Sequence, residues 1–100
     1  MPLNAAAAYL QFLRKGQGLT QAMLAATLSL PVLTIERLER AEAAVAPEVL
    51  AAVVSALGAS SAQVEYLLRF EPQSKEEGAK IIRLGIDLAK AWLRGEQLAT

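Results

Sequence analysis

Two kinds of side chain are missing from this chain altogether. It contains no cysteine and no histidine, so neither thiolate nor imidazole is available to it. Zinc sites built from Cys and His are therefore excluded, as are disulfide bonds and nucleophilic sites built from Cys or from a Ser–His pair. The sequence also has no recognisable pair of catalytic groups and no nucleotide-binding loop. We therefore expect a protein that is not an enzyme and that binds no cofactor and no metal.

An excess of charge of one sign is missing as well. Residues 1–70 hold five basic and five acidic residues, and so do residues 71–100. Proteins that bind nucleic acid usually carry a basic excess, because contacts with phosphate supply much of their affinity. The composition alone therefore gives no sign of a nucleic-acid ligand.

The chain has no long apolar run that could cross a membrane. The run Met23–Ile35 is interrupted by Pro31 and falls short of the roughly 20 residues that a span needs. Met1–Tyr9 lacks the basic start of a signal peptide. We therefore expect no membrane partner and a cytoplasmic location, which suits a chain without disulfide bonds.

The residues that are present favour helices. Apolar residues make up 54% of the chain, and its many alanine and leucine residues are strong helix formers. Caps, glycine stops and apolar spacings predict helices over residues 4–15, 21–28, 31–43, 47–57, 62–70 and 74–94, and no strand. A break at residues 71–73 predicts a domain of residues 1–70 followed by a C-terminal segment, residues 74–98.

Several short motifs in the first two thirds of the chain share a family's spacing. They are Gly18-Leu19-Thr20-Gln21, Leu24-Ala25, the run from Ile35 to Arg40, Pro47, Ala56-Leu57-Gly58 and Tyr66-Leu67-Leu68. The stretch that holds them resembles the lambda-type repressor/Cro family of helix-turn-helix proteins, also called the XRE family. The resemblance implies an all-α fold, in which a five-helix repressor-like helix-turn-helix bundle is followed by a C-terminal amphipathic helix. It also implies a sequence-specific regulator of transcription that binds double-stranded DNA as a dimer.

The resemblance also implies which residues face the DNA. In this family the third helix lies in the major groove and the second crosses the phosphate backbone. The implied DNA-binding residues are Thr20, Gln21, Val32, Leu33, Thr34, Arg37 and Arg40. Thr20 is expected first as a helix cap, and Gln21 either contacts phosphate or is a plain exposed glutamine. The two arginines reach phosphate or a guanine edge, or pair with nearby glutamates.

One further pair of positions matches the family. Arg14 and Glu39 stand where the family has a partly buried ion pair that ties the first helix to the third. The resemblance therefore implies that Arg14 is structural and does not contact DNA. Removing one partner of such a pair is costly, although the pair itself adds little net stability.

Three features depart from the family pattern. The front of the third helix is Pro31, Val32 and Leu33, and apolar side chains there can only touch a thymine methyl group. Residues 41–46 contain no basic residue. Ser29 replaces the usual turn glycine, at a cost on the order of 1 kcal/mol if its φ is positive. These departures keep a second function open, a protein-interaction module such as a repressor antagonist or an antitoxin-like partner.

The last helix is apolar around more of its circumference than one docking surface needs. Its apolar arc spans roughly 200°, about twice the usual stripe. One interpretation is a homodimer interface at Ile81, Gly85, Leu88 and Trp92, with a close helix approach at the glycine and the tryptophan as a buried anchor. The alternative is a sixth core helix in a monomer.

Overall fold

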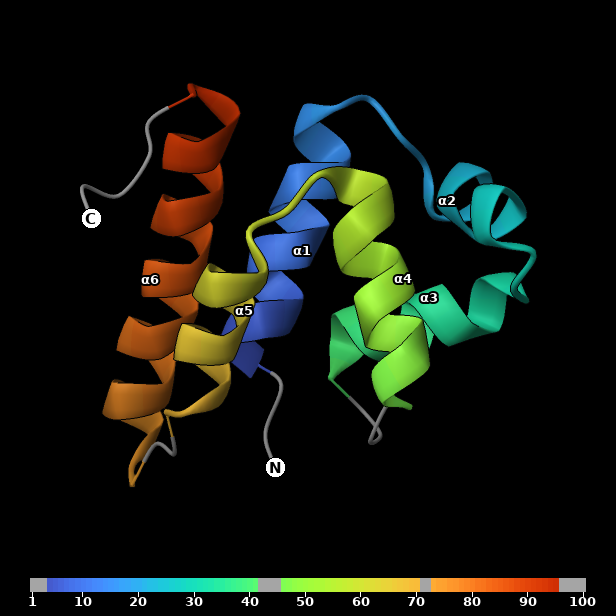
Figure 1. Cartoon of the computed structure of the whole chain (residues 1–100). Coiled ribbons are helices and arrows are strands. Elements are labelled where there is room, and N and C mark those ends of the chain that lie inside the picture. Colours follow the sequence, from blue (N-terminus) through green and yellow to red (C-terminus); the bar gives the residue numbers. More distant parts are fainter. Residues whose placement is uncertain (1–3, 42–45, 71–72, 96–100) are drawn as a thin grey trace.

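The computed structural model describes residues 4–41, 46–70 and 73–95, and these form only helices, turns and loops. The helices are α1 (Asn4–Gly16), α2 (Gln21–Leu28), α3 (Val32–Arg40), α4 (Pro47–Leu57), α5 (Ser61–Leu68) and α6 (Lys75–Leu93). The predicted all-α fold, a five-helix bundle followed by a C-terminal helix, is confirmed (Figure 1). Among the described helices, none has the length and apolar content to cross a membrane.

Hydroxyl caps begin three of these helices. The side chains of Thr20, Ser60 and Ser74 each accept a hydrogen bond from the backbone N–H three residues later, over 3.0 to 3.2 Å. Such a bond satisfies one of the N–H groups that the first turn of a helix leaves without a partner. The local sequence therefore determines where α2, α5 and α6 start.

Helix α3 is shorter than the sequence predicted. Ala41 has a left-handed φ of 56°, and its N–H donates to the carbonyl oxygens of Arg37 and Leu38, which ends the helix at Arg40. A left-handed cap of this kind is usual for glycine, and alanine adopts it at some cost. The expected extension to residue 43 lies outside the described residues after Ala41.

Helix α1 is the centre of the molecule. It packs against α3, α4, α5 and α6, and its Tyr9, Leu10 and Leu13 are fully buried (Figure 1). The other helices bury these residues in the same core: Leu24, Ala25, Ile35, Leu38, Val53 and Leu57. The Tyr9 hydroxyl accepts a hydrogen bond from the backbone N–H of Ser60 over 3.1 Å. Burial raises the pKa of Tyr9 above its ordinary value of 10.0.

Helix α6 joins the same core rather than forming a separate unit. It lies along α1, and Ala89 is completely buried (Figure 1). A Cβ atom at Gly85 would strike the carbonyl oxygen of Ala5, so this glycine lets the two helix backbones touch. The indole N–H of Trp92 donates to the carbonyl oxygen of Gly58 over 2.8 Å. Residues 96–98 of the expected C-terminal segment lie outside the described residues.

This packing bears on the expected dimer interface. The close helix approach at Gly85 is made by α1 of the same chain, so Gly85 is buried and presents no surface to a second subunit. Ile81, Leu88 and Trp92 also pack against the core, and each is only partly buried. The alternative interpretation, a sixth core helix, therefore accounts for the part of the apolar arc that faces α1 and the core.

We predict that Gly85→Ala destabilises the protein even though alanine is the better helix former. The added methyl group meets the backbone of α1, which cannot rotate away, and such overpacking costs about 1–3 kcal/mol. The higher helix propensity of alanine offsets about 1 kcal/mol of this destabilisation. Urea unfolding followed by circular dichroism should show a lower free energy of unfolding. Arg83→Ala, at an exposed position of α6, is the control and should change it by less than about 0.5 kcal/mol. A gain of stability from Gly85→Ala would contradict the close approach.

Candidate nucleic-acid interface

Helices α2 and α3 form a pair around a sharp corner. Ser29 sits at the corner with a left-handed φ of 55°, and its N–H donates to the carbonyl oxygens of Ala25 and Ala26. Leu30 closes the turn through a hydrogen bond from its N–H to the oxygen of Ala25, over 2.9 Å. The positive φ considered for Ser29 from the sequence is therefore present. The pair lies at one edge of the molecule, and α6 lies at the opposite edge beyond α1 (Figure 1).

A buried ion pair fastens this pair of helices to the core. The guanidinium of Arg14 in α1 makes a two-point contact with the carboxylate of Glu39 in α3, from Nε to Oε2 over 2.6 Å and from Nη2 to Oε1 over 2.9 Å. A third nitrogen, Nη1, donates to the carbonyl oxygen of Leu19 just before α2 over 2.6 Å. Both charged side chains are more than nine-tenths buried. Arg14 is therefore structural, as the resemblance implied.

The two candidate residues at the start of α2 have separate tasks. Thr20 is the helix cap, and its hydroxyl accepts from the N–H of Met23 over 3.0 Å. Gln21 is half-buried, and its side-chain amide donates to Oε1 of Glu39 over 3.0 Å. A glutamine amide carries two N–H donors, and this bond uses one of them. Glu39 of the ion pair thus holds the Gln21 side chain in place, and this hydrogen bond leaves the second N–H of the amide unused.

Helix α3 places its candidate residues on an outward face. Ile35 and Leu38 point into the core, whereas Leu33, Arg37 and Arg40 are spaced four and three residues apart and share the exposed side. Val32 and Leu33 are among the most exposed large apolar residues in the described chain, at 41% and 46%. Thr34 is half-buried at the edge of this face. The candidate residues therefore form one surface, with Thr34 at its margin.

The charge of this surface differs from that of the whole chain. Helix α2 contains no charged residue, and Glu39 of α3 is neutralised inside the protein by Arg14. The charged groups left on the outer side of α3 are Glu36, Arg37 and Arg40. Among the described residues of α2 and α3, the outer side carries two arginines and one glutamate, a small positive excess, whereas the chain as a whole is neutral.

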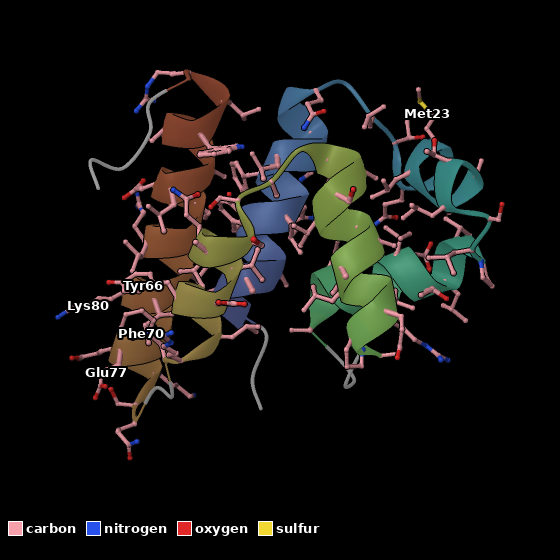
Figure 2. All side chains as sticks on the ribbon, viewed as in Figure 1. Met23, Tyr66, Phe70, Glu77 and Lys80 are labelled. Atoms are coloured by element: carbon pink, nitrogen blue, oxygen red, sulfur yellow. The ribbon has the colours of Figure 1, made fainter. Side chains whose placement is uncertain are left out.

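Two surface features were not singled out from the sequence. Met23 of α2 is 49% exposed and points away from the molecule (Figure 2). An apolar groove of about 510 Å³ lies between α4 and α5, and its described lining comes from those two helices and the segment between them. Leu50, Val54 and Val64 supply much of its apolar wall. Neither feature has a sequence signal, because an apolar residue in a helix is more often buried than exposed.

The comparison with protein families agrees with this geometry. A family model described as a helix-turn-helix domain matches residues 5–67, which is more than half of the chain. The matched span runs through α1 to α5 and stops before α6. The comparison with curated proteins and the comparison with solved structures each find no match.

We predict that Arg14→Ala lowers the free energy of unfolding by about 3–5 kcal/mol, because it leaves the Glu39 carboxylate buried without a cation. Replacing both partners by methionine should recover most of the loss, since no buried charge then remains. Urea denaturation of Arg14→Ala and of the double methionine variant measures the loss and its recovery. The control is Lys15→Ala, the exposed neighbour in the same helix. A loss for Arg14→Ala no larger than that of Lys15→Ala would refute the role of the pair.

Proposed function

Because the chain belongs to the helix-turn-helix domain family, we propose that it is a sequence-specific transcriptional regulator that binds double-stranded DNA as a homodimer. The observation that supports this most is the exposure of α3, whose outer face carries Val32, Leu33, Arg37 and Arg40 at the edge of the molecule (Figure 1). A helix about 10–12 Å wide with an uncovered face suits a major groove about 12 Å wide. In this proposal the protein is a binding protein rather than an enzyme, and it acts in the cytoplasm.

The remaining candidate residues have positioning roles in this proposal. Thr20 and Gln21 lie at the N-terminus of α2, where backbone N–H groups and the helix dipole favour a phosphate. The hydrogen bond from Gln21 to Glu39 ties that phosphate site to the helix that enters the groove. Thr34 lies beside the groove-facing residues. Phosphate contacts of this kind position a protein on the duplex, and contacts with base edges specify the sequence.

The homodimer is the less direct part of the proposal. Two-fold dimers are the commonest small oligomers, and helix-turn-helix dimers bind paired half-sites about one helical turn apart. Ile82 and Ile86, one turn apart on α6, are partly exposed on one side of the buried Gly85 and Ala89. Ile81, Leu88 and Trp92, on the other side, are partly exposed and pack against the core. Ile82 and Ile86 therefore supply the apolar strip for a second copy, whereas Gly85 is already covered by α1.

One observation favours the second candidate, a protein-interaction module. Exposed Val32 and Leu33 are adjacent, and adjacent exposed apolar side chains are typical of protein-contact surfaces. The weakly positive charge of the α3 face favours DNA over this alternative. The two candidates differ in how binding responds to salt, because only the DNA complex releases counterions from phosphate.

We expect the whole chain to bind a duplex selected from a random pool of double-stranded DNA. The logarithm of the affinity should fall linearly with the logarithm of the salt concentration, because counterions are released from phosphate. Arg37→Ala should weaken binding at least about fivefold, since an arginine contact with guanine is worth about 1–3 kcal/mol. Fluorescence anisotropy measures both effects. Arg83→Ala on α6, on the opposite side of the molecule, is the matched control. No duplex retained at low salt would exclude DNA binding.

For the dimer, we expect sedimentation equilibrium to give twice the chain mass of 10.7 kDa. Ile86→Lys should return the mass to 10.7 kDa. A dimer interface on the partly exposed Ile82 and Ile86 would bury the lysine charge without an opposite charge beside it, which is costly. Circular dichroism of the variant checks that the helices remain. A monomer mass for the unchanged chain, at concentrations at which it binds DNA, would contradict the dimer.

A further inference from the structure

The outward face of α3 is divided into an apolar front and a cationic rear. Val32 and Leu33 form its first turn, and Arg37 and Arg40 follow one and two turns after Leu33 on the same side. Leu33 lies at the middle of the exposed arc, opposite the buried Ile35 and Leu38. Any ligand that lies along this face therefore meets branched hydrocarbon first and guanidinium groups next.

The apolar front offers no side-chain hydrogen bond. Val32 and Leu33 carry only C–H groups, and Pro31 before them lacks even a backbone N–H. The N–H of Thr34 is already used, because it donates to the carbonyl oxygen of Pro31 over 3.0 Å. Among the groups on the major-groove edges of the four bases, only the C5-methyl group of thymine is apolar. That methyl group is the one feature of a base pair that the side chains of Val32 and Leu33 can recognise favourably.

Resting on the proposed function, we infer that Val32 and Leu33 recognise C5-methyl groups of pyrimidines, so that the preferred duplex has thymines opposite the first turn of α3. Arg37, one turn further on, then contacts a guanine edge or a phosphate beside those thymines. The occupant of this surface is DNA rather than a protein, because two arginines continue the row that Leu33 begins and match phosphate charge. A cytosine methylated at C5 presents the same methyl group and is recognised by the same contact.

The test removes single methyl groups from the DNA. A duplex is first selected from a random pool with the whole chain, and each thymine is then replaced in turn by deoxyuridine, which lacks only the C5-methyl group. At the positions facing Val32 and Leu33, each replacement should weaken binding about fourfold, the value of one buried methyl or methylene group. A cytosine placed at the same position should gain about fourfold when it is methylated at C5. Together, the uracil and methylcytosine duplexes separate the methyl group from the rest of the base.

Protein variants assign the effect to residues. At the position that Leu33 contacts, Leu33→Ala should bind the thymine and uracil duplexes with equal affinity. The DNA methyl group contributes to binding there only while the leucine side chain is present to contact it. Leu33 is exposed, so its truncation leaves the core unchanged. Tyr66→Ala is the matched control, since Tyr66 is equally exposed at 46% and lies on α5, on the side of the molecule away from α3 (Figure 2). That variant should keep the fourfold difference.

These experiments distinguish a failure of methyl recognition from a failure of the proposed DNA binding. If uracil replaces every thymine of the selected duplex without loss of affinity, DNA binding stands and methyl recognition is overturned. If Leu33→Asp binds the selected duplex as tightly as the unchanged chain, the apolar front does not face the DNA, as expected for a protein-contact surface, and the inference is overturned. If no duplex is selected at all, the proposed function fails and this inference fails with it.

Discussion

The contact between Arg14 and Glu39 determines how the rest of this structure is arranged. A guanidinium in α1 makes a two-point contact with a carboxylate in α3 and also donates to the carbonyl oxygen of Leu19, directly before α2. Glu39 in turn accepts from Gln21 in the first turn of α2. One buried cluster thus joins three helices. A buried ion pair of this kind adds little net stability, so its main effect is to set the relative orientation of α2 and α3.

The same cluster changes the charge that the surface presents. Arg14 and Glu39 are neutralised inside the protein, so neither contributes to the outer field of the α2–α3 pair. What remains on α3 is two arginines, one glutamate and an apolar first turn. A chain with no net charge can therefore present a weakly positive surface to DNA. The balanced composition is a property of the whole chain and not of this face.

The first and last helices, α1 and α6, pack side by side. Gly85 allows the α6 backbone to touch α1 at Ala5, and Trp92 reaches the carbonyl oxygen of Gly58 between α4 and α5. These contacts hold α6 on the side of the molecule opposite α3 (Figure 1). The outer face of α3 is consequently left uncovered by the other described helices. Attachment of α6 and exposure of α3 thus both follow from the central position of α1.

Most of the fold could be predicted from the sequence, because its signals are local. Thr20, Ser60 and Ser74 act through a hydrogen bond three residues away, and the apolar spacing of α3 separates Ile35 and Leu38 from the outer face. The corner at Ser29 and the pairing of Arg14 with Glu39 came from the family resemblance. The end of α3 was predicted too late, because the left-handed turn at Ala41 has no sequence signal.

The sequence by itself determined where most of the helices start and which of their faces are apolar. Only the tertiary structure decided which neighbour covers each apolar face and which charges reach the surface. Gly85 and Trp92 were expected at an interface between subunits, and both make contacts inside the chain. Gln21 was expected either to contact phosphate or to be a plain exposed glutamine, and its amide also donates a hydrogen bond to Glu39. The reason is physical. An amphipathic pattern shows that one face of a helix is buried out of water, but the packing of segments distant in the sequence decides which partner covers that face.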